Sequence, residues 1–427
     1  MVRFQAAFKS PIVYKRIFIR AKTCLLSVNS VVITRKVFDR ISDPVMLCTT
    51  LACQPKPRQH FCFWKGDFLA ADEFPKKWFQ NRRFCLPEWG GVLTFELSDI
   101  LAARQRIRGV ADNTPFMSSP FMASQMGHDF LMKIEAMQPI GAFKLRGALS
   151  AVAALSDDVK GVTCCSTGNH GRGVAYAAKQ RGMRAVICMS SLVPRAKVDG
   201  IRALGAEVRI VGSSQDEAMY ESQRLCEDEG LVEISPFDDP HVIAGQGTIG
   251  LEMMEARPDL ELILVPLSGG GLVAGVATAA KAINPQVRVI GVSMDRGAAM
   301  HASLKAGKPV EVPEFASLAD SLGGGIGLDN KLSFPLCRDL LDDVILVTEE
   351  EIRSAMQVVF FEDRIVAEGA SVVGHAAVLS GKCPQPKGPV ATIITGRNLD
   401  MRTYLDVISG RNVQVGDLHL KGAQYDA

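Results

Sequence analysis

The alternation of short apolar runs with helix-length segments, from about residue 130 onward, constrains the fold more than any other feature of this chain. Alternation of this kind needs crossover connections, so it predicts a mostly parallel sheet covered by helices on both faces. The predicted strands are FLMKIEAM (130–137), GVTCCS (161–166), RAVICMS (184–190), EVRIVG (207–212), LVEIS (231–235), LELILVPLS (260–268) and VRVIGVSM (287–294). Helices are expected after GNHG, VPRAK, SSQDE, DDPHV and GGGLV.

Two of these strands, and a further predicted strand within PVATIITGRNLD (389–400), end in turns that suit ligand binding, because ligands of such folds lie at the carboxyl ends of strands. Glycine lets the backbone approach a ligand, and a helix start offers N–H groups to a carboxylate or a phosphate. Each turn alone is common in α/β proteins of every function. The turns are Thr167-Gly168-Asn169-His170-Gly171, Ser268-Gly269-Gly270-Gly271-Leu272 and Thr395-Gly396-Arg397-Asn398.

Lys144 lies in an apolar setting, within the stretch QPIGAFKLRG (138–147). One interpretation is a helix-start lysine whose stem packs while its ammonium reaches water. The other is a desolvated lysine whose lowered pKa makes it a nucleophilic amine of the kind that forms Schiff bases. Ten residues alone favour the first interpretation, and only the rest of the chain can choose between them.

Six motifs together resemble the pyridoxal-phosphate enzymes of fold type II, in the branch of threonine dehydratase and serine racemase. The resemblance covers roughly residues 92–405, and its details are most similar to the dehydratase of hydroxyectoine utilisation. It implies an α/β fold of two doubly wound parallel-sheet domains, like the β subunit of tryptophan synthase. The motifs are GAFKLRGA (141–148), STGNHGRG (166–173), KVDGIRALGAEV (197–208), FDDPHVIAGQGTIGLE (237–252), SGGGL (268–272) and TGRN (395–398).

The resemblance implies pyridoxal 5'-phosphate as cofactor, bound covalently by Lys144. Phe143 would pack against the cofactor ring, and Asn169 would hydrogen-bond its phenolic oxygen. Thr395 would meet the pyridine nitrogen, and a neutral hydroxyl partner there makes the ring a milder electron sink than a carboxylate partner would. Glu368 would lie near the cofactor. The phosphate would bind at Ser268, Gly269, Gly270, Gly271 and Leu272.

The resemblance also implies the substrate and the reaction, a dehydratase or ammonia-lyase that converts a 3-hydroxy amino acid into a 2-oxo acid and ammonia. Lys144 would remove the Cα proton. Arg172 replaces a glutamine usual in the family and has two interpretations, a solvent-facing residue or a cation that recognises a polar substrate tail. Asp320 would lie on the substrate side. The substrate carboxylate would bind at Ser166, Thr167, Gly168, Asn169 and His170.

Other functions remain open at this point. Thr167 stands where serine racemases carry a serine, so its hydroxyl could reprotonate Cα and make the chain an amino-acid racemase. Residues 260–295 also match a dinucleotide fingerprint, with Gly269, Gly271 and Gly275 before a strand ending at Asp295, which would indicate an NAD-dependent enzyme. A catalytically idle cofactor carrier or amino-acid sensor is a third reading. The NAD reading leaves Lys144 unexplained.

Residues 1–91 differ in kind from the rest of the chain. They hold 16 lysine and arginine residues against 6 aspartate and glutamate residues, which leaves a net charge of −8 for the remainder of a chain whose total is +2. A targeting presequence, a small domain and a misplaced start are all compatible with this segment, and a disordered extension or a misplaced start is favoured. The expected organisation is an extension over 1–91, a large cofactor domain over 92–158 and 240–410, a small domain over 159–239 and a tail over 411–427.

The composition also bounds the cell compartment and the partners. The 11 cysteines do not pair by spacing, which favours buried thiols in a reducing cytoplasm. Cys48, Cys53, His60 and Cys62 lack the spacing of a zinc knuckle, and Ser293 and Ala299 stand at positions where serine racemases carry acidic metal ligands, so no metal is expected. No apolar run is long enough to span a membrane. We expect a small amino-acid substrate, no nucleic acid, a homodimer as in the family, and a degradative role because only 29 residues follow Asn398.

Overall fold

The computed structural model describes residues 2–7, 28–34, 47–51, 59–63 and 95–426, except Thr167, Leu192, Pro194 and Ser214. The chain divides into two compact units, Met1–Arg82 and Arg83–Ala427. In the first unit, β1 (Val2–Ala7) pairs in parallel with β2 (Val28–Thr34), and β3 (Leu47–Leu51) pairs antiparallel with β4 (Gln59–Phe63). Most of residues 1–91 lie outside the described residues, so the expectation of an extension stays a prediction.

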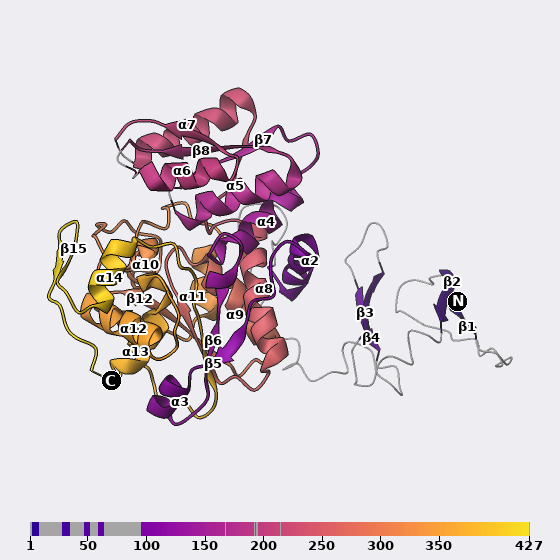
Figure 1. Ribbon diagram of the computed structural model, residues 1–427. Helices are drawn as coiled ribbons and strands as arrows, with labels where there is room; N and C mark the ends of the chain where they lie inside the picture. Colours follow the sequence, from indigo (N-terminus) through magenta and orange to yellow (C-terminus); the bar gives the residue numbers. More distant parts are fainter. Residues whose placement is uncertain are drawn as a thin grey trace. The chain divides into compact units, whose positions relative to one another are not determined.

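A four-stranded parallel sheet forms the smaller lobe of the second unit, in the upper part of Figure 1. Its strand order is β10-β7-β8-β9, and the bounds are β7 Gly161–Cys165, β8 Arg184–Met189, β9 Glu207–Ile210 and β10 Val232–Glu233. The crossover helices are α5 (Asn169–Arg181), α6 (Arg195–Ala203) and α7 (Gln215–Glu229). Four of the predicted strands and three of the predicted helices are thereby confirmed.

A six-stranded sheet forms the larger lobe, with the order β13-β12-β11-β14-β6-β5. All neighbours run parallel except β5 and β6, which are antiparallel, so the predicted mostly parallel α/β architecture is confirmed. The predicted strand 130–137 ends at Lys133 and continues as the 3₁₀ helix η2 (Glu135–Met137). The bounds are β5 Phe116–Ser118, β6 Phe130–Lys133, β11 Leu262–Pro266, β12 Arg288–Met294, β13 Asp343–Val347 and β14 Val390–Ile393.

Helices and short elements complete the larger lobe. α8 begins with strong local signals, because Asp239 accepts hydrogen bonds from the N–H groups of His241 and Val242, and Pro240 occupies the first helical position. The elements are α2 Leu97–Ile107, α3 Pro120–Met126, α4 Lys144–Ala154, α8 Pro240–Ala256, α9 Gly271–Ile283, α10 Ala299–Ala306, η3 Asp320–Leu322, α11 Ser333–Leu340, α12 Glu349–Phe361, η4 Gly369–Ser371, α13 Val373–Leu379, α14 Met401–Ile408 and the hairpin β15 Val413–Val415 with β16 Leu418–Leu420. The division into domains at 159 and 239 stays a prediction.

Glycines let α8 pack directly against α4 and α9. A Cβ on Gly245 of α8 would lie 2.7 Å from the Cα of Gly147 on α4, and a Cβ on Gly247 would lie 3.0 Å from the carbonyl oxygen of Gly275 on α9. Such backbone contacts leave no room for a side chain. The three helices therefore form one tightly packed stack, in which Gly275 is explained by packing.

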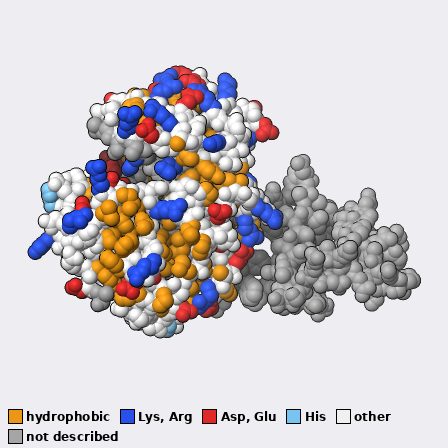
Figure 2. Space-filling model, viewed as in Figure 1, with side chains coloured by type: hydrophobic (Ala, Val, Ile, Leu, Met, Phe, Trp, Pro, Cys, Tyr) orange, Lys and Arg blue, Asp and Glu red, His pale blue; other side chains and the backbone are white. Residues whose placement is uncertain are grey.

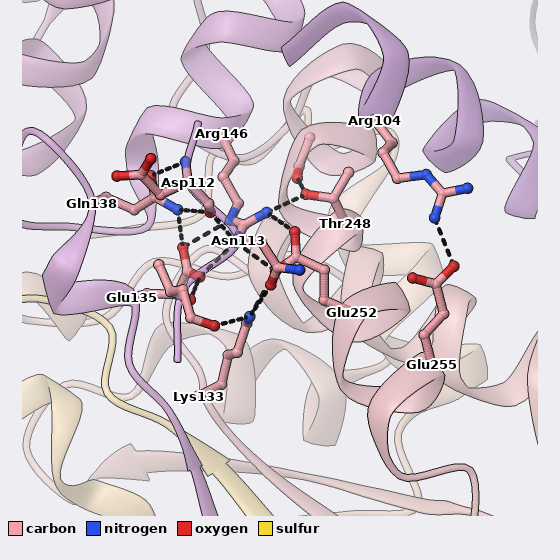
Figure 3. A network of polar contacts seen from close by, with 12 residues as sticks. Arg104, Asp112, Asn113, Lys133, Glu135, Gln138, Arg146, Thr248, Glu252 and Glu255 are labelled. Atoms are coloured by element: carbon pink, nitrogen blue, oxygen red, sulfur yellow. Dashed lines mark hydrogen bonds and ion pairs between the residues drawn. The ribbon is translucent and has the colours of Figure 1, made fainter. Parts of the chain in front are cut away.

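A buried network of charges joins α4, α8 and the end of β6 (Figure 3). Arg146 binds Glu135 with two hydrogen bonds of 2.8 Å and binds Glu252 with bonds of 2.7 and 2.8 Å. The Nζ of Lys133 lies 2.6 Å from Glu252. Burial alone would raise the pKa of Glu135, but the attraction and hydrogen bonds of Arg146 outweigh it and hold that pKa below its ordinary value. Two cations and two carboxylates thus balance one another inside the lobe.

The surface differs between the two lobes on the face seen in Figure 2. Charged side chains predominate over the smaller lobe, whereas hydrophobic side chains gather in patches over the larger one. Exposed apolar residues of the larger lobe include Met401 and Leu405, which lie one turn apart on α14. Among the described residues, no helix combines the length and the apolar character that crossing a lipid bilayer requires.

We predict that Glu135→Gln lowers the free energy of unfolding by about 3 kcal/mol, because it leaves the buried Arg146 with one of its two carboxylates. Urea denaturation followed by circular dichroism measures the change. Since the folded-state pKa of Glu135 lies below its ordinary value of 4.5, this contribution is present above pH 4.5 and is lost as the pH falls through the lower value. The difference in the free energy of unfolding between the parent protein and Glu135→Gln should therefore become smaller as the pH falls below 4.5.

Glu255→Gln is the matched control, because Glu255 also pairs with an arginine, Arg104, at 2.6 Å but at the surface (Figure 3). Exposed pairs contribute about 0–1 kcal/mol, so this variant should unfold almost as the parent does. Equal losses in the two variants would contradict the importance of the buried network.

Candidate active site

Lys144 is the first residue of α4, and its amine contacts the segment that connects β10 of the smaller lobe to α8 of the larger lobe. It donates a hydrogen bond of 2.5 Å to the carbonyl oxygen of Pro236 and lies 5.4 Å from the ring centroid of Phe143. No carboxylate pairs with it among the described residues. The side chain keeps some accessible area, but the burial of its amine lowers its pKa to about 8. Lys144 thus combines burial with a partly neutral amine near pH 7.

Backbone and amide contacts bring the lysine motif beside the polar strand tip after β14. The N–H of Phe143 donates to the carbonyl oxygen of Thr395 at 2.9 Å, and Ala142 forms a bridge with Gly396. The amide Nδ2 of Asn398 donates to Oδ1 of Asn169 at 2.7 Å. Three motifs that are far apart in the sequence, around residues 144, 169 and 395, therefore meet.

Glu368 is a buried acceptor shared by these motifs. Its carboxylate accepts from the Nδ2 of Asn169 at 3.1 Å to each oxygen, from the N–H of Asn398 at 2.6 Å and from the hydroxyl of Ser321 at 3.2 Å. Burial raises the pKa of Glu368, and these hydrogen bonds oppose the rise. The side-chain amide of Asn169 is thus held in place by Asn398 and Glu368.

Thr395 is 5% exposed, and its hydroxyl lies 2.9 Å from the hydroxyl of Ser371. The oxygen of Ser371 also accepts from the N–H of Gly396 at 2.8 Å. Sequence reasoning assigned no role to Ser371, which lies in η4 and is the last residue of the stretch VAEGAS (366–371) that contains Glu368. A chain of two hydroxyls therefore stands at this strand tip.

The glycine loop after β11 leads into α9 with an unusual backbone. Gly270 has φ +89°, in the left-handed region, and α9 begins at Gly271, so the first N–H groups of the helix lie next to the loop. The ring of Phe237 packs against Gly269, and a Cβ on Gly271 would lie 2.8 Å from the carbonyl oxygen of Phe237. Ser268 is half-buried and Leu272 is buried. The loop offers backbone donors of the kind that hold an anion.

The turn before α5 is compact. The N–H of Gly168 donates to the hydroxyl of Ser166 at 3.4 Å, and the carbonyl oxygen of Ser166 contacts Gly171 closely. His170 is buried, and its Nε2 donates to the carbonyl oxygen of Ile234 at 2.7 Å. Burial, followed by the charge of Lys144, lowers the pKa of His170 to about 3, so the ring is neutral. Thr167 lies outside the described residues.

Arg172 and Asp320 stand apart from this cluster. Arg172 is half-buried on α5, where its guanidinium lies beside Gly200 of α6, and its Nε has no hydrogen-bond partner within the described part of the chain. Asp320 is 68% exposed and lies 3.9 Å from the Nζ of Lys197 on α6. Its neighbour Ser321, and not Asp320 itself, contacts Glu368.

No group of three or more histidine, cysteine, aspartate and glutamate residues could hold a metal ion in the described ranges. The side chains of Cys48, Cys53, His60 and Cys62 lie outside the described residues. Cys164 and Cys188 are buried and form no disulfide.

Comparison with known proteins gives a family match over most of the second unit. A family profile described as pyridoxal-phosphate dependent enzyme matches residues 107–396. A Sinorhizobium fredii protein provisionally named threonine dehydratase is 54% identical over 74% of this chain and 95% of its own length. L-threonine ammonia-lyase of Thermotoga maritima is 40% identical over 75% of this chain and 80% of its own length. Maize serine racemase has a structure that matches with a TM-score of 0.69 and 36% identity, over 73% of this chain and 96% of that one.

The donor set fits pyridoxal phosphate. An amine with a pKa of about 8 suits an aldehyde, and the start of α9 with its left-handed Gly270 suits a phosphate. The hydroxyl of Thr395 and the amide of Asn169 are positioned by other side chains, as groups that contact a ring need to be.

We predict that the apoprotein reacts with pyridoxal phosphate through an amine that titrates near pH 8, because burial lowers the pKa of Lys144 from 10.5 to about 8. Below that value the amine is an ammonium and cannot attack the aldehyde, so the rate should rise with pH and level off above about 9. Stopped-flow absorbance between pH 6 and 10 measures the rate. The reaction of N-acetyl-lysine over the same pH range is the reference, because the aldehyde changes with pH in the same way in both reactions. A midpoint for the protein equal to that of this reference amine would contradict the assignment.

Proposed function

Because the chain belongs to the family of pyridoxal-phosphate dependent enzymes, we propose that it is an ammonia-lyase that converts a 3-hydroxy amino acid into a 2-oxo acid and ammonia. The observation that carries this proposal is the amine of Lys144, which is buried without a carboxylate partner among the described residues and has a pKa of about 8. The reaction consumes no water overall, because the water lost from the β-carbon is returned when ammonia is released.

Bound pyridoxal phosphate supplies an electron-withdrawing ring that stabilises negative charge on Cα. Lys144 would hold the cofactor aldehyde, and its free amine would remove the Cα proton of the substrate. With a pKa of about 8, about one amine in ten is neutral at pH 7, whereas an ordinary lysine has almost none. The carbonyl of Pro236, 2.5 Å away, orients the amine without fixing its charge as a carboxylate would.

The turn before α5 is the proposed carboxylate site. The first N–H groups of α5 have no acceptor within the helix, and they face a turn that Ser166 and Gly171 keep compact. A neutral His170 adds no charge that would hold the carboxylate too tightly. We assign Ser166 to His170, with Thr167 among them, to substrate binding.

The hydroxyls of Thr395 and Ser371 are proposed to set the protonation state of the pyridine nitrogen of the cofactor. Thr395 can donate its one proton to that nitrogen if it does not donate it to Ser371, whose hydroxyl lies 2.9 Å away and can itself donate to the carbonyl oxygen of Gly396 at 2.9 Å. Asn169 would meet the phenolic oxygen with its side-chain amide, which Glu368 holds in place through contacts of 3.1 Å to each carboxylate oxygen. A neutral hydroxyl leaves the nitrogen unprotonated, which favours loss of a β substituent over longer-lived negative charge on Cα.

Racemisation is a second candidate activity, favoured by the similarity to maize serine racemase. A racemase needs a proton donor on the face of Cα opposite to Lys144. The hydroxyl of Thr167 is the proposed donor, and its extra methyl group relative to serine would hinder the step.

Finer aspects of the function rest on sequence resemblance. We propose a catabolic role, with hydroxyectoine degradation as the specific pathway, and a substrate tail that is polar or acidic. Support for the tail comes from Arg172, a half-buried cation without an ion-pair partner in the described residues. Asp320, at the opposite lobe, is the proposed substrate-side carboxylate.

We also propose a cytoplasmic homodimer. The support is the family resemblance, together with the hydrophobic patches over the larger lobe (Figure 2). Light scattering after size-exclusion chromatography should give about twice the chain mass of 46.2 kDa. A mass of one chain at micromolar concentration would contradict the dimer.

We predict that Lys144→Ala lowers ammonia release by roughly 10³-fold or more, because it removes both the cofactor anchor and the base. The assay measures ammonia and 2-oxo acid from a panel of hydroxy amino acids that includes L-threonine, L-serine and 3-hydroxy amino acids with longer polar tails. Chiral chromatography of the same mixtures measures D-serine, which should form more slowly than ammonia.

Lys382→Ala serves as the control, because Lys382 forms a surface ion pair with Glu351 outside the proposed site. It should retain the activity of the parent protein. Normal ammonia release by Lys144→Ala would refute the mechanism, and D-serine formation faster than ammonia release would favour the racemase.

A further inference from the structure

We propose that Ser333 and Asp238 position the glycine loop for phosphate binding, although neither belongs to the loop. Both are positioning residues that act through backbone groups of other segments. The inference rests on the proposed phosphate site at residues 268–272 and extends it to Ser333, which lies outside the six motifs, and to Asp238, which lies in one of them without an assigned role.

Ser333 fixes the orientation of one peptide plane in the loop. Its hydroxyl donates to the carbonyl oxygen of Gly269 at 2.7 Å, and Asn330 donates to the Ser333 oxygen at 2.8 Å, which leaves the hydroxyl proton for Gly269. In a trans peptide the carbonyl and the following N–H point in opposite directions. Because the Gly269 carbonyl is turned back toward α11, the N–H of Gly270 is turned away from α11, toward the ligand side of the loop.

Asp238 fixes the helix that carries Ser333. Its carboxylate accepts from the N–H groups of Lys331, Leu332 and Ser333, each at 2.8 Å. The residue at the N-cap position of α11, Leu332, has no side chain that could cap the helix. A carboxylate at a helix N-terminus satisfies its free donors and interacts favourably with the helix dipole. Asp238 therefore caps α11 from a segment about 90 residues away in the sequence.

The residues on either side of Asp238 extend this connection to Lys144. Pro236 accepts the hydrogen bond from the Lys144 amine, and Phe237 packs against Gly269 and Gly271. Residues 236–238 lie between β10 of the smaller lobe and α8 of the larger lobe. Three consecutive linker residues thus contact the amine, the glycine loop and the cap of α11, so one segment sets the positions of both ends of the proposed cofactor site.

Loss of the Ser333 hydroxyl should weaken binding of the phosphate alone. The Gly269 peptide could then rotate, and the Gly270 N–H would no longer be held toward the phosphate. A hydrogen bond to a charged group contributes about 1.5 kcal/mol or more, which corresponds to roughly a tenfold change in affinity. Pyridoxal has no phosphate, so its affinity should not depend on Ser333.

The test compares the affinities of the full-length apoprotein for pyridoxal phosphate and for pyridoxal, measured by absorbance titration without any amino acid. Ser333→Ala should raise the dissociation constant for pyridoxal phosphate about tenfold and change that for pyridoxal less than twofold. Ser119→Ala is the matched control, because Ser119 is also a buried serine that bonds to a backbone group, the N–H of Met122, at the start of α3. It should change neither constant.

Asp238→Asn provides a second variant that keeps the side-chain shape, with Asp400→Asn as its control because Asp400 caps α14 in the same way. Like Ser333→Ala, Asp238→Asn should weaken the binding of pyridoxal phosphate more than that of pyridoxal. Asp400→Asn should leave both affinities unchanged. The proposal is overturned if the Ser333 and Asp238 variants leave that preference unchanged, or weaken both ligands by the same factor. Since no substrate is present, the result does not depend on which reaction the enzyme catalyses.

Discussion

The buried pairing of Arg146 with Glu135 and Glu252 is the interaction on which the geometry of the site depends. Arg146 follows Lys144 by two residues in the first turn of α4. Because its guanidinium is paired with two carboxylates, the rotation of that turn about the helix axis is fixed. Buried ion pairs add little to net stability, because desolvation offsets the attraction, but they specify geometry strongly where only one arrangement satisfies every charge. Here Glu135 comes from η2 and Glu252 from α8, and by holding Arg146 they determine the direction in which the Lys144 side chain leaves α4.

Much of the fold could be predicted from the sequence, because strands buried on both faces read as continuous apolar runs. Boundaries were less visible. The run 130–137 contains a strand that stops at Lys133, since Glu135 turns to meet Arg146 and a tertiary ion pair overrides the local pattern. Strand β13 (Asp343–Val347) escaped notice because its run DVILV follows acidic residues and precedes a helix rich in glutamate. Local patterns specify element type well and tertiary contacts specify where elements end.

The candidate site divides in the same way. Glycines and polar side chains at strand ends are visible in the sequence, and the structure brings Lys144, Asn169 and Thr395 into one cluster. The roles of the supporting residues could not be predicted, for a physical reason. Pro236 acts through a carbonyl group, and Asp238 acts on three N–H groups about 90 residues away, so neither function leaves a mark on the surrounding residue types. Thr167 and Arg172 keep the roles that sequence resemblance alone suggests.

The glycine contacts of α8 have a consequence for which ligands the protein can hold. Lys144 begins α4 and the glycine loop leads into α9, while α8 lies against both helices with backbone touching backbone. Packing this close resists sliding, because any shift drives main-chain atoms into one another. The distance between the Lys144 amine and the glycine loop is therefore fixed, and it selects ligands by their length. Vitamers that are shorter or longer than this distance would contact either the Lys144 amine or the glycine loop but not both, whatever their functional groups.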